Sequence, residues 1–230
     1  MVAFRLTQYG AREIALAGLV VTVLCVGLIW GAVAVCPYVA TLMVFPVGAW
    51  AWVLWFFRDP DRKTPQGPGL FVSPADGRVS DITPSGPEGP LGREGLRIGV
   101  FMSVFDVHVN RAPCDGRVET IERRPGAFLD VRKADAFERN ESTTIRMTCT
   151  HAGKGWHVVV RQVAGLIARR IVTDLAEGQD LTRGQRIGMV KFGSRLELWL
   201  PLELVGQVRV RVGAQARAGE TVLVEAPKEP

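Results

Sequence analysis

Cysteine and histidine are scarce in this chain of 230 residues, which contains four cysteines and three histidines. No two cysteines form a C-x-x-C pair, because two lie in the apolar N-terminal stretch and two are scattered through the polar part: Cys25, Cys36, Cys114 and Cys149. This spacing excludes a disulfide framework and a zinc site, and we expect no metal. The four thiols are expected to be small buried hydrophobic groups in a reducing, cytoplasmic setting.

Nucleotide-binding and nucleic-acid-binding signatures are also missing. The sequence has no Walker loop and no G-x-G-x-x-G after a predicted strand. Its formal net charge is +5, yet the basic residues are not interleaved with aromatic residues as in a nucleic-acid-binding surface. A modest basic excess suits other anionic partners, such as lipid head groups or a phosphorylated substrate.

Charge is absent from two long N-terminal runs. Ile14 to Val35 gives 22 uncharged residues, and a helix of that length spans about 33 Å, against about 30 Å for a bilayer core. Pro37 ends this run, and Tyr38 to Phe57 gives 20 more uncharged residues, with Pro46 at a place where proline can kink a helix. The first run is too long for a signal peptide and a second follows at once. We therefore predict that residues 1–57 form a membrane-anchoring helical hairpin.

The basic residues around these runs predict the orientation of the hairpin. Arg5 and Arg12 precede it, Arg58, Arg62 and Lys63 follow it, and none lies between its helices. The positive-inside rule then places both ends, and the domain that follows, on the cytoplasmic side of the inner (cell) membrane. The proline and the tryptophans leave a second possibility open, a re-entrant or interfacial hairpin that does not cross fully.

Residues 58–230 show short apolar runs separated by glycine, proline and aspartate. Runs of this length, rich in valine and isoleucine, are typical of strands. Many short strands with glycine turns predict a mainly β domain, shaped like a barrel or a sandwich. The clearest expected strands are Leu96–Met102, Thr143–Thr148, Trp156–Val163, Leu196–Leu200, Val208–Val212 and Thr221–Val224.

Several segments of this domain contain residues that can carry chemistry, although each alone has a simpler interpretation. Asp76-Gly77 is a common turn dipeptide. His108 lies in alternating sequence, where a strand histidine is more often structural. Gly193-Ser194 suits an ordinary turn before a strand.

Taken together and in order, these segments resemble one family, the short prokaryotic phosphatidylserine decarboxylases. The resemblance runs from about residue 50 to about residue 205, and the ordered set is far more specific than any single motif. Its segments are Phe57–Pro60, Ser73–Val79, Phe101–Pro113, Glu138–Glu141, Gln162–Val172 and Phe192–Arg195.

The resemblance implies a proenzyme that cuts itself between Gly193 and Ser194. The products are a large chain, residues 1–193, and a small chain, residues 194–230, which stay together as a heterodimer. Assembly of these heterodimers into a higher oligomer is left open. Ser194 becomes a covalent pyruvoyl group, the cofactor. This group forms a Schiff base with phosphatidylserine in the membrane, and decarboxylation gives phosphatidylethanolamine in phospholipid biosynthesis.

The resemblance also implies helper residues. Asp76 matches an aspartate of the family, and His108 matches the first of two histidines. Arg111 stands where the second histidine is expected, and arginine cannot act as a base near neutral pH. His108 is thus a candidate for self-cleavage, for proton delivery in decarboxylation, or for both.

Arg169 and Arg170 are candidates for the lipid phosphate, because guanidinium groups bind phosphate through paired hydrogen bonds. A solvated surface pair is the alternative for them.

Two other functions fit parts of the sequence. A membrane hairpin followed by glycine-punctuated, lipoyl-like strands also resembles a non-catalytic adaptor of membrane transport assemblies, which would remain one intact chain. A membrane enzyme acting on another anionic phospholipid is the third possibility.

Overall fold

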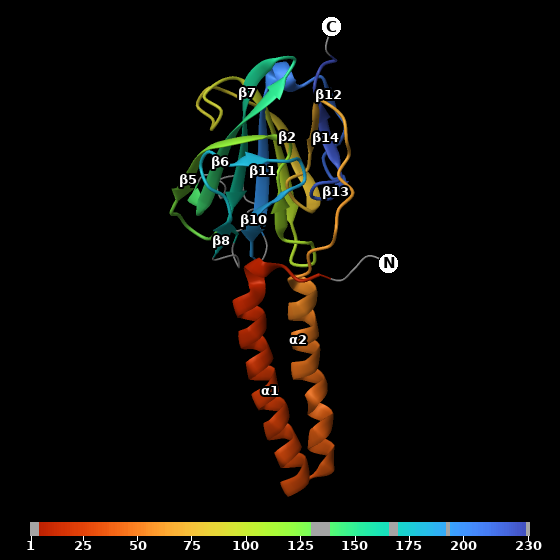
Figure 1. Ribbon diagram of the computed structural model, residues 1–230. Coiled ribbons are helices and arrows are strands. Elements are labelled where there is room, and N and C mark those ends of the chain that lie inside the picture. The colour runs from red at the N-terminus through yellow and green to blue at the C-terminus, as the bar shows by residue number, and fades with distance from the viewer. Residues whose placement is uncertain (1–4, 130–138, 166–169, 192–193, 229–230) are drawn as a thin grey trace. The chain divides into compact units, whose positions relative to one another are not determined.

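The computed structural model describes residues 5–129, 139–165, 170–191 and 194–228. The chain divides into two compact units, Met1–Asp61 and Arg62–Pro230, each with its own set of internal contacts. The first is a helical hairpin and the second is built of strands (Figure 1). A mainly β fold with an N-terminal apolar helical hairpin is therefore confirmed.

The hairpin consists of two α-helices, α1 (Ala11–Ala34) and α2 (Val44–Phe56), which follow 3-10 helices η1 (Gln8–Gly10) and η2 (Pro37–Met43) respectively. Both helical stretches, 8–34 and 37–56, are long and apolar enough to cross a membrane by length and composition. Large apolar side chains on their surface are exposed, among them Val33 at 85% and Phe45 at 71%. Water does not favour such a surface, so the hairpin is suited to a lipid environment.

Two prolines shape the second arm of the hairpin. The first helix ends at Ala34, and Pro37 begins η2, as expected for a residue that cannot continue the helical hydrogen-bond ladder. Pro46 lies in the first turn of α2, where the missing N–H is least costly. The change from 3-10 to α geometry just precedes it.

An antiparallel sheet of eight strands forms the centre of the second unit and curls into a half-barrel (Figure 1). Strand β11 lies inside this sheet, paired with β3 on one side and β7 on the other. In spatial order the strands are β13 (Gln215–Ala216), β2 (Gly77–Ser85), β3 (Gly95–Met102), β11 (Ser194–Pro201), β7 (Lys154–Val163), β6 (Ser142–His151), β5 (Gly116–Arg124) and β9 (Asp180–Leu181).

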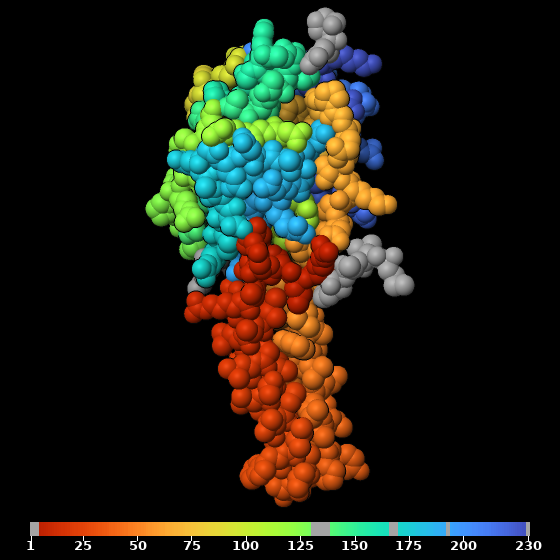
Figure 2. All heavy atoms as spheres, in the orientation of Figure 1, coloured from red at the N-terminus to blue at the C-terminus, as the bar shows by residue number. Residues whose placement is uncertain are grey.

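Two sheets of three strands pack against one face of the large sheet and share its core. One has the order β1 (Leu70–Val72), β14 (Val222–Glu225), β12 (Gln207–Val208), and the other β4 (Val109–Arg111), β10 (Arg186–Val190), β8 (Ile171–Thr173). A short 3-10 helix, η3 (Leu202–Leu204), follows β11. The common core joins Phe71 and Val224 of the first small sheet, Ile187 of the second, and Ile98 and Leu198 of the large sheet. In Figure 2 the start of this unit (orange) accordingly lies against its C-terminal strands (blue).

Alternation along β11 separates the two faces of the large sheet. Leu196, Leu198 and Leu200 belong to the apolar core. Successive side chains of a strand point to opposite faces, so Arg195, Glu197 and Trp199 face the other way. By the same alternation Ser194 belongs to the core face.

Most expected strands are present, and one is shorter than predicted. Strands β3, β6, β7 and β11 cover the runs predicted at 96–102, 143–148, 156–163 and 196–200, and β14 begins one residue later than the run predicted at 221–224. The run 208–212 is strand only at Gln207–Val208. Val212 is 59% exposed, so the valines of this run do not all face the core, and the pairing with β14 ends early.

Candidate functional site

Ser194 is the first residue of β11, where its Cα partner is Met102, the last residue of β3. Its side chain is fully buried, and its Oγ makes no hydrogen bond to any residue that the structure describes. Leaving a buried hydroxyl unpaired costs about 1–3 kcal/mol. Such groups are rare in native structures and call for an explanation, of which a chemical role is one.

Asp76 is brought to the same end of β3 by the glycine that follows it. Gly77 has φ of +143°, and a Cβ added there would lie 2.0 Å from the carbonyl oxygen of Phe101. Only glycine permits this approach of β2 to β3. The turn interpretation of Asp76-Gly77 is therefore too narrow, because Gly77 also lets the backbone next to Asp76 approach Phe101 and Met102, and Met102 pairs with Ser194.

The Asp76 carboxylate is held by two donors. Arg62 Nη2 donates to both of its oxygens at 2.9 and 2.7 Å, and the Ala218 N–H donates to Oδ1 at 2.8 Å. Burial raises the pKa of Asp76 above its ordinary value of 3.8, against the lowering effect of Arg62 and of the Ala218 N–H. The negative charge of Asp106 raises it further, so Asp76 and Asp106 lie within electrostatic range of each other.

His108 is positioned by the turn that follows β3. Asp106 Oδ2 accepts hydrogen bonds from the N–H and the hydroxyl of Ser103, at 2.8 and 2.7 Å. His108 is completely buried, and its Nδ1 lies 2.9 Å from the Asp106 carbonyl oxygen. A carbonyl only accepts, so Nδ1 carries the proton, and Nε2 is the basic nitrogen of the neutral ring.

A chain of polar side chains runs across the core face next to Met102. Asn110 Nδ2 donates to the sulfur of Met102 at 3.8 Å, Gln162 Nε2 donates to Asn110 Oδ1 at 2.8 Å, and Thr173 Oγ1 donates to Gln162 Oε1 at 2.9 Å. It ties β3, β4, β7 and β8 together beside the start of β11. The sequence interpretation gave these residues no role, although Asn110 and Gln162 lie within segments that carry the family resemblance.

Arg111 is engaged elsewhere. Its Nη1 donates to the Gly184 carbonyl at 3.0 Å, and its backbone N–H donates to the Pro74 carbonyl at 2.9 Å. Arg111 thus holds the loop at Gly184 and links β4 to the segment that leads to Asp76.

Arg62 also belongs to this site, although in the sequence it served only to predict the orientation of the hairpin in the membrane. Its side chain is 7% exposed and also lies 3.5 Å from Glu220. The sequence offered one indication of a role for Arg62, its place two residues after Phe57–Pro60, one of the family segments.

The remaining predicted residues are less well defined by the structure. Gly193 and Arg169 lie outside the described residues. Arg170 is exposed, and its carbonyl accepts a hydrogen bond from the Lys191 N–H at 3.3 Å.

Comparison with known proteins places this chain in a family. The family model described as phosphatidylserine decarboxylase matches residues 50–224. The chain belongs to the phosphatidylserine decarboxylase family. A similar relative, the phosphatidylserine decarboxylase proenzyme of Paramagnetospirillum magneticum, is 44% identical over 177 residues, which cover 76% of this chain and 72% of the relative.

Membership of the phosphatidylserine decarboxylase family confirms the resemblance inferred from the sequence. The match includes Asp76, His108 and Ser194 and nearly all of the β unit, and it begins within α2 of the hairpin. The family therefore accounts for the segments that meet at the end of β3, and it favours an enzyme over the adaptor.

Proposed function

We propose that this chain decarboxylates phosphatidylserine to phosphatidylethanolamine, using a pyruvoyl group that it makes from Ser194 by cutting the Gly193–Ser194 bond. Family membership supports the reaction. The buried Oγ of Ser194, which has no hydrogen-bond partner among the described residues, is the structural observation that carries the proposal of self-cleavage. A hydroxyl that is not held by another group is able to attack the carbonyl of the preceding residue.

The self-cleavage steps use groups of the chain itself. The Ser194 Oγ gives up its proton to a base, for which we propose His108 Nε2, and attacks the Gly193 carbonyl carbon. The C–N bond breaks, the protonated base gives its proton to the Ser194 nitrogen, and an ester replaces the amide. Loss of the Ser194 α-proton then expels the Gly193 carboxylate from Cβ and leaves dehydroalanine. Water replaces the nitrogen, ammonia leaves, and a ketone remains at residue 194.

The surroundings of Ser194 fit a pyruvoyl group. Ser194 is buried, and the neighbouring strand β7 carries Gln162, whose Nε2 donates to Asn110 Oδ1. When present, this group supplies an electron sink for the pair of electrons released as carbon dioxide leaves. His108 Nε2 is proposed to hold and deliver the proton that replaces the carboxylate.

Asp76 is proposed to assist through its charge. Its oxygens are already bonded to Arg62 and Ala218, and it is coupled electrostatically to Asp106, whose carbonyl orients His108. Asp76 would thus stabilise positive charge that develops on the imidazole. Arg169 and Arg170 remain candidates for the phosphate of the lipid head group, and the exposure of Arg170 is compatible with that role.

The location that we propose is the inner membrane, with the hairpin as anchor and the β unit on the cytoplasmic side. The apolar helices 8–34 and 37–56 and the basic residues at both ends of the hairpin support it.

The proposed function is tested with Ser194→Ala, which removes the attacking hydroxyl. We expect one uncut chain that releases no phosphatidylethanolamine from phosphatidylserine in mixed micelles, whereas the wild type is cut and active. Thr150→Val is the matched control, because it removes the hydroxyl of an exposed residue of β6 in the same sheet, and it should behave as the wild type. Wild-type turnover by Ser194→Ala would contradict the proposal.

A further inference from the structure

A groove with a volume of about 1170 Å³ lies on the large sheet, on the face opposite the core. Trp199 lines it, and Trp199 points away from the face of β11 to which Leu196, Leu198 and Ser194 belong. The groove is therefore separate from the site around Ser194. Two glutamates line it, Glu88 and Glu122, together with six arginines: Arg97, Arg123, Arg124, Arg139, Arg146 and Arg161.

The floor of the groove and the layer beneath it hold three guanidinium groups that share two carboxylates. Arg195 makes the closest ion pairs, at 2.7 Å to Asp81 and 3.1 Å to Glu197. Arg97 lies 3.3 Å from Asp81, and Arg161 lies 3.9 Å from Glu197. The side chains of Arg161 and Arg97 are only 10% and 17% exposed, so positive charge is held where water screens it poorly.

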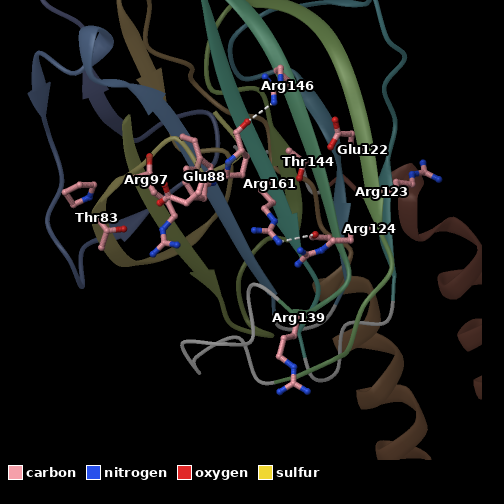
Figure 3. A pocket seen from close by; sticks show the side chains of 16 residues that line it. Thr83, Glu88, Arg97, Glu122, Arg123, Arg124, Arg139, Thr144, Arg146 and Arg161 are labelled. Atoms are coloured by element: carbon pink, nitrogen blue, oxygen red, sulfur yellow. Dashed lines mark hydrogen bonds between the residues drawn. The ribbon is translucent and has the colours of Figure 1, made fainter. Parts of the chain in front are cut away.

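The walls of the groove add further donors. Arg146 extends from β6, and its Nη2 donates to the Pro90 carbonyl at 2.8 Å. Arg123 is exposed at the end of β5. Figure 3 shows Arg97, Arg161 and Arg124 spread across the groove, with Arg139 toward one end of it. The hydroxyls of Ser142 and Thr144 line it as well.

We propose that this groove binds the phosphate group of an anionic phospholipid head group or of a soluble phosphate monoester, as an accessory site. A phosphate presents several oxygens to guanidinium forks, which bind it by paired, charge-assisted hydrogen bonds. Six arginines against two glutamates give the lining a positive balance, and its volume holds a ligand larger than phosphate alone. This proposal does not depend on the proposed function, because the groove and Ser194 lie on opposite faces of the sheet.

Isothermal titration of the full chain in an uncharged detergent tests the proposal. The soluble probe is sn-glycerol 3-phosphate, the lipid probe is short-chain phosphatidylglycerol, and short-chain phosphatidylcholine is the zwitterionic control. The titrations are made with both the wild type and Ser194→Ala, so that binding is separated from cleavage and turnover. We expect saturable binding of at least one phosphate probe to both proteins, weakened by added salt.

The double variant Arg123→Gln, Arg146→Gln should raise the Kd for that probe by about tenfold or more, since a charge-assisted hydrogen bond contributes about 1.5–3 kcal/mol. The matched control is Arg117→Gln, Arg209→Gln, which removes the same charge from side chains that are 65% and 45% exposed and do not line the groove. It should leave the Kd unchanged.

Binding of glycerol phosphate would identify a soluble ester as sufficient, and binding of phosphatidylglycerol alone would identify the lipid. No binding of either probe, or equal weakening by both double variants, would overturn the proposal. Hydrogen–deuterium exchange of the wild type gives a measurement that does not depend on the variants. The bound probe should protect residues 122–124 and 142–146, and protection elsewhere alone would also overturn the proposal.

Discussion

At the scale of single residues, the structure defines which ring nitrogen of His108 can act as a base. The Asp106 carbonyl fixes its Nδ1–H and leaves Nε2 as the basic nitrogen. We expect His108→Ala to slow self-cleavage, decarboxylation or both by about 10²–10⁴-fold, the usual contribution of a general acid or base. His151→Ala is the control, since His151 is only half-buried and its Nε2 lies 3.0 Å from the Pro227 carbonyl oxygen. Quench-timed gels and product release measure the two steps, and wild-type rates for both in His108→Ala would refute the assignment.

Asp76 gives a prediction about pH. Its pKa in the folded protein is raised above 3.8, so the stability that it contributes is fully present below 3.8 and is lost as pH rises through the raised value. Asp76→Asn does not titrate. The free energy of unfolding of the wild type minus that of the variant should therefore fall as pH rises above about 3.8. Urea unfolding at several pH values, with Ser194→Ala present in both proteins, measures it. A difference that rises over this range would contradict the raised pKa.

The candidate site residues that the sequence could suggest are those in ordered family segments: Asp76, His108 and Ser194. Their partners could not be found in that way. Arg62 meets Asp76 across 14 positions, and Ala218 meets it across 142, because tertiary pairing brings them together. The groove arginines come from β3, β5, β6 and β7 and from Arg139 before β6, and they form one surface only after the register of the sheet is set.

At the scale of elements, the hairpin and the long strands follow directly from sequence pattern, because the hairpin consists of two long uncharged runs and the strands are short runs rich in valine and isoleucine between turn residues. The short strands do not. Strands β9, β12 and β13 have two residues each, and their pairing with longer neighbours, rather than their own composition, defines them. The curl of the large sheet likewise arises from register shifts, such as those at Val79/Asp81 and Val118/Thr120.

The hairpin gives the prediction at this scale. A chain that begins at Asp59 lacks both apolar helices, so we expect it to leave the membrane fraction, while the full chain resists extraction by high salt because apolar burial rather than charge anchors it. Sedimentation of membranes followed by immunoblotting measures the distribution. Full retention of the shortened chain in the membrane would show that another surface is the main anchor.

At the scale of the whole molecule, the proposed cut lies at the N-terminal end of β11, a strand that is paired on both sides. After a cut before Ser194, β11 would still lie between β3 and β7, and β14 would still pair with β1. The Asp76–Ala218 hydrogen bond and the Arg62–Glu220 ion pair also join residues 1–193 to residues 194–230. The two products should therefore copurify without a covalent link and separate only on unfolding.

The intact mass of the purified, unfolded wild-type protein is the sharpest test of self-cleavage before Ser194. We expect two chains, residues 1–193 with a free carboxylate at Gly193, and residues 194–230 with a mass lower by one ammonia than their sequence gives. The missing amine should also block Edman sequencing of the small chain. A single chain of unmodified mass that still converts phosphatidylserine to phosphatidylethanolamine would rule out self-cleavage and a pyruvoyl group at residue 194.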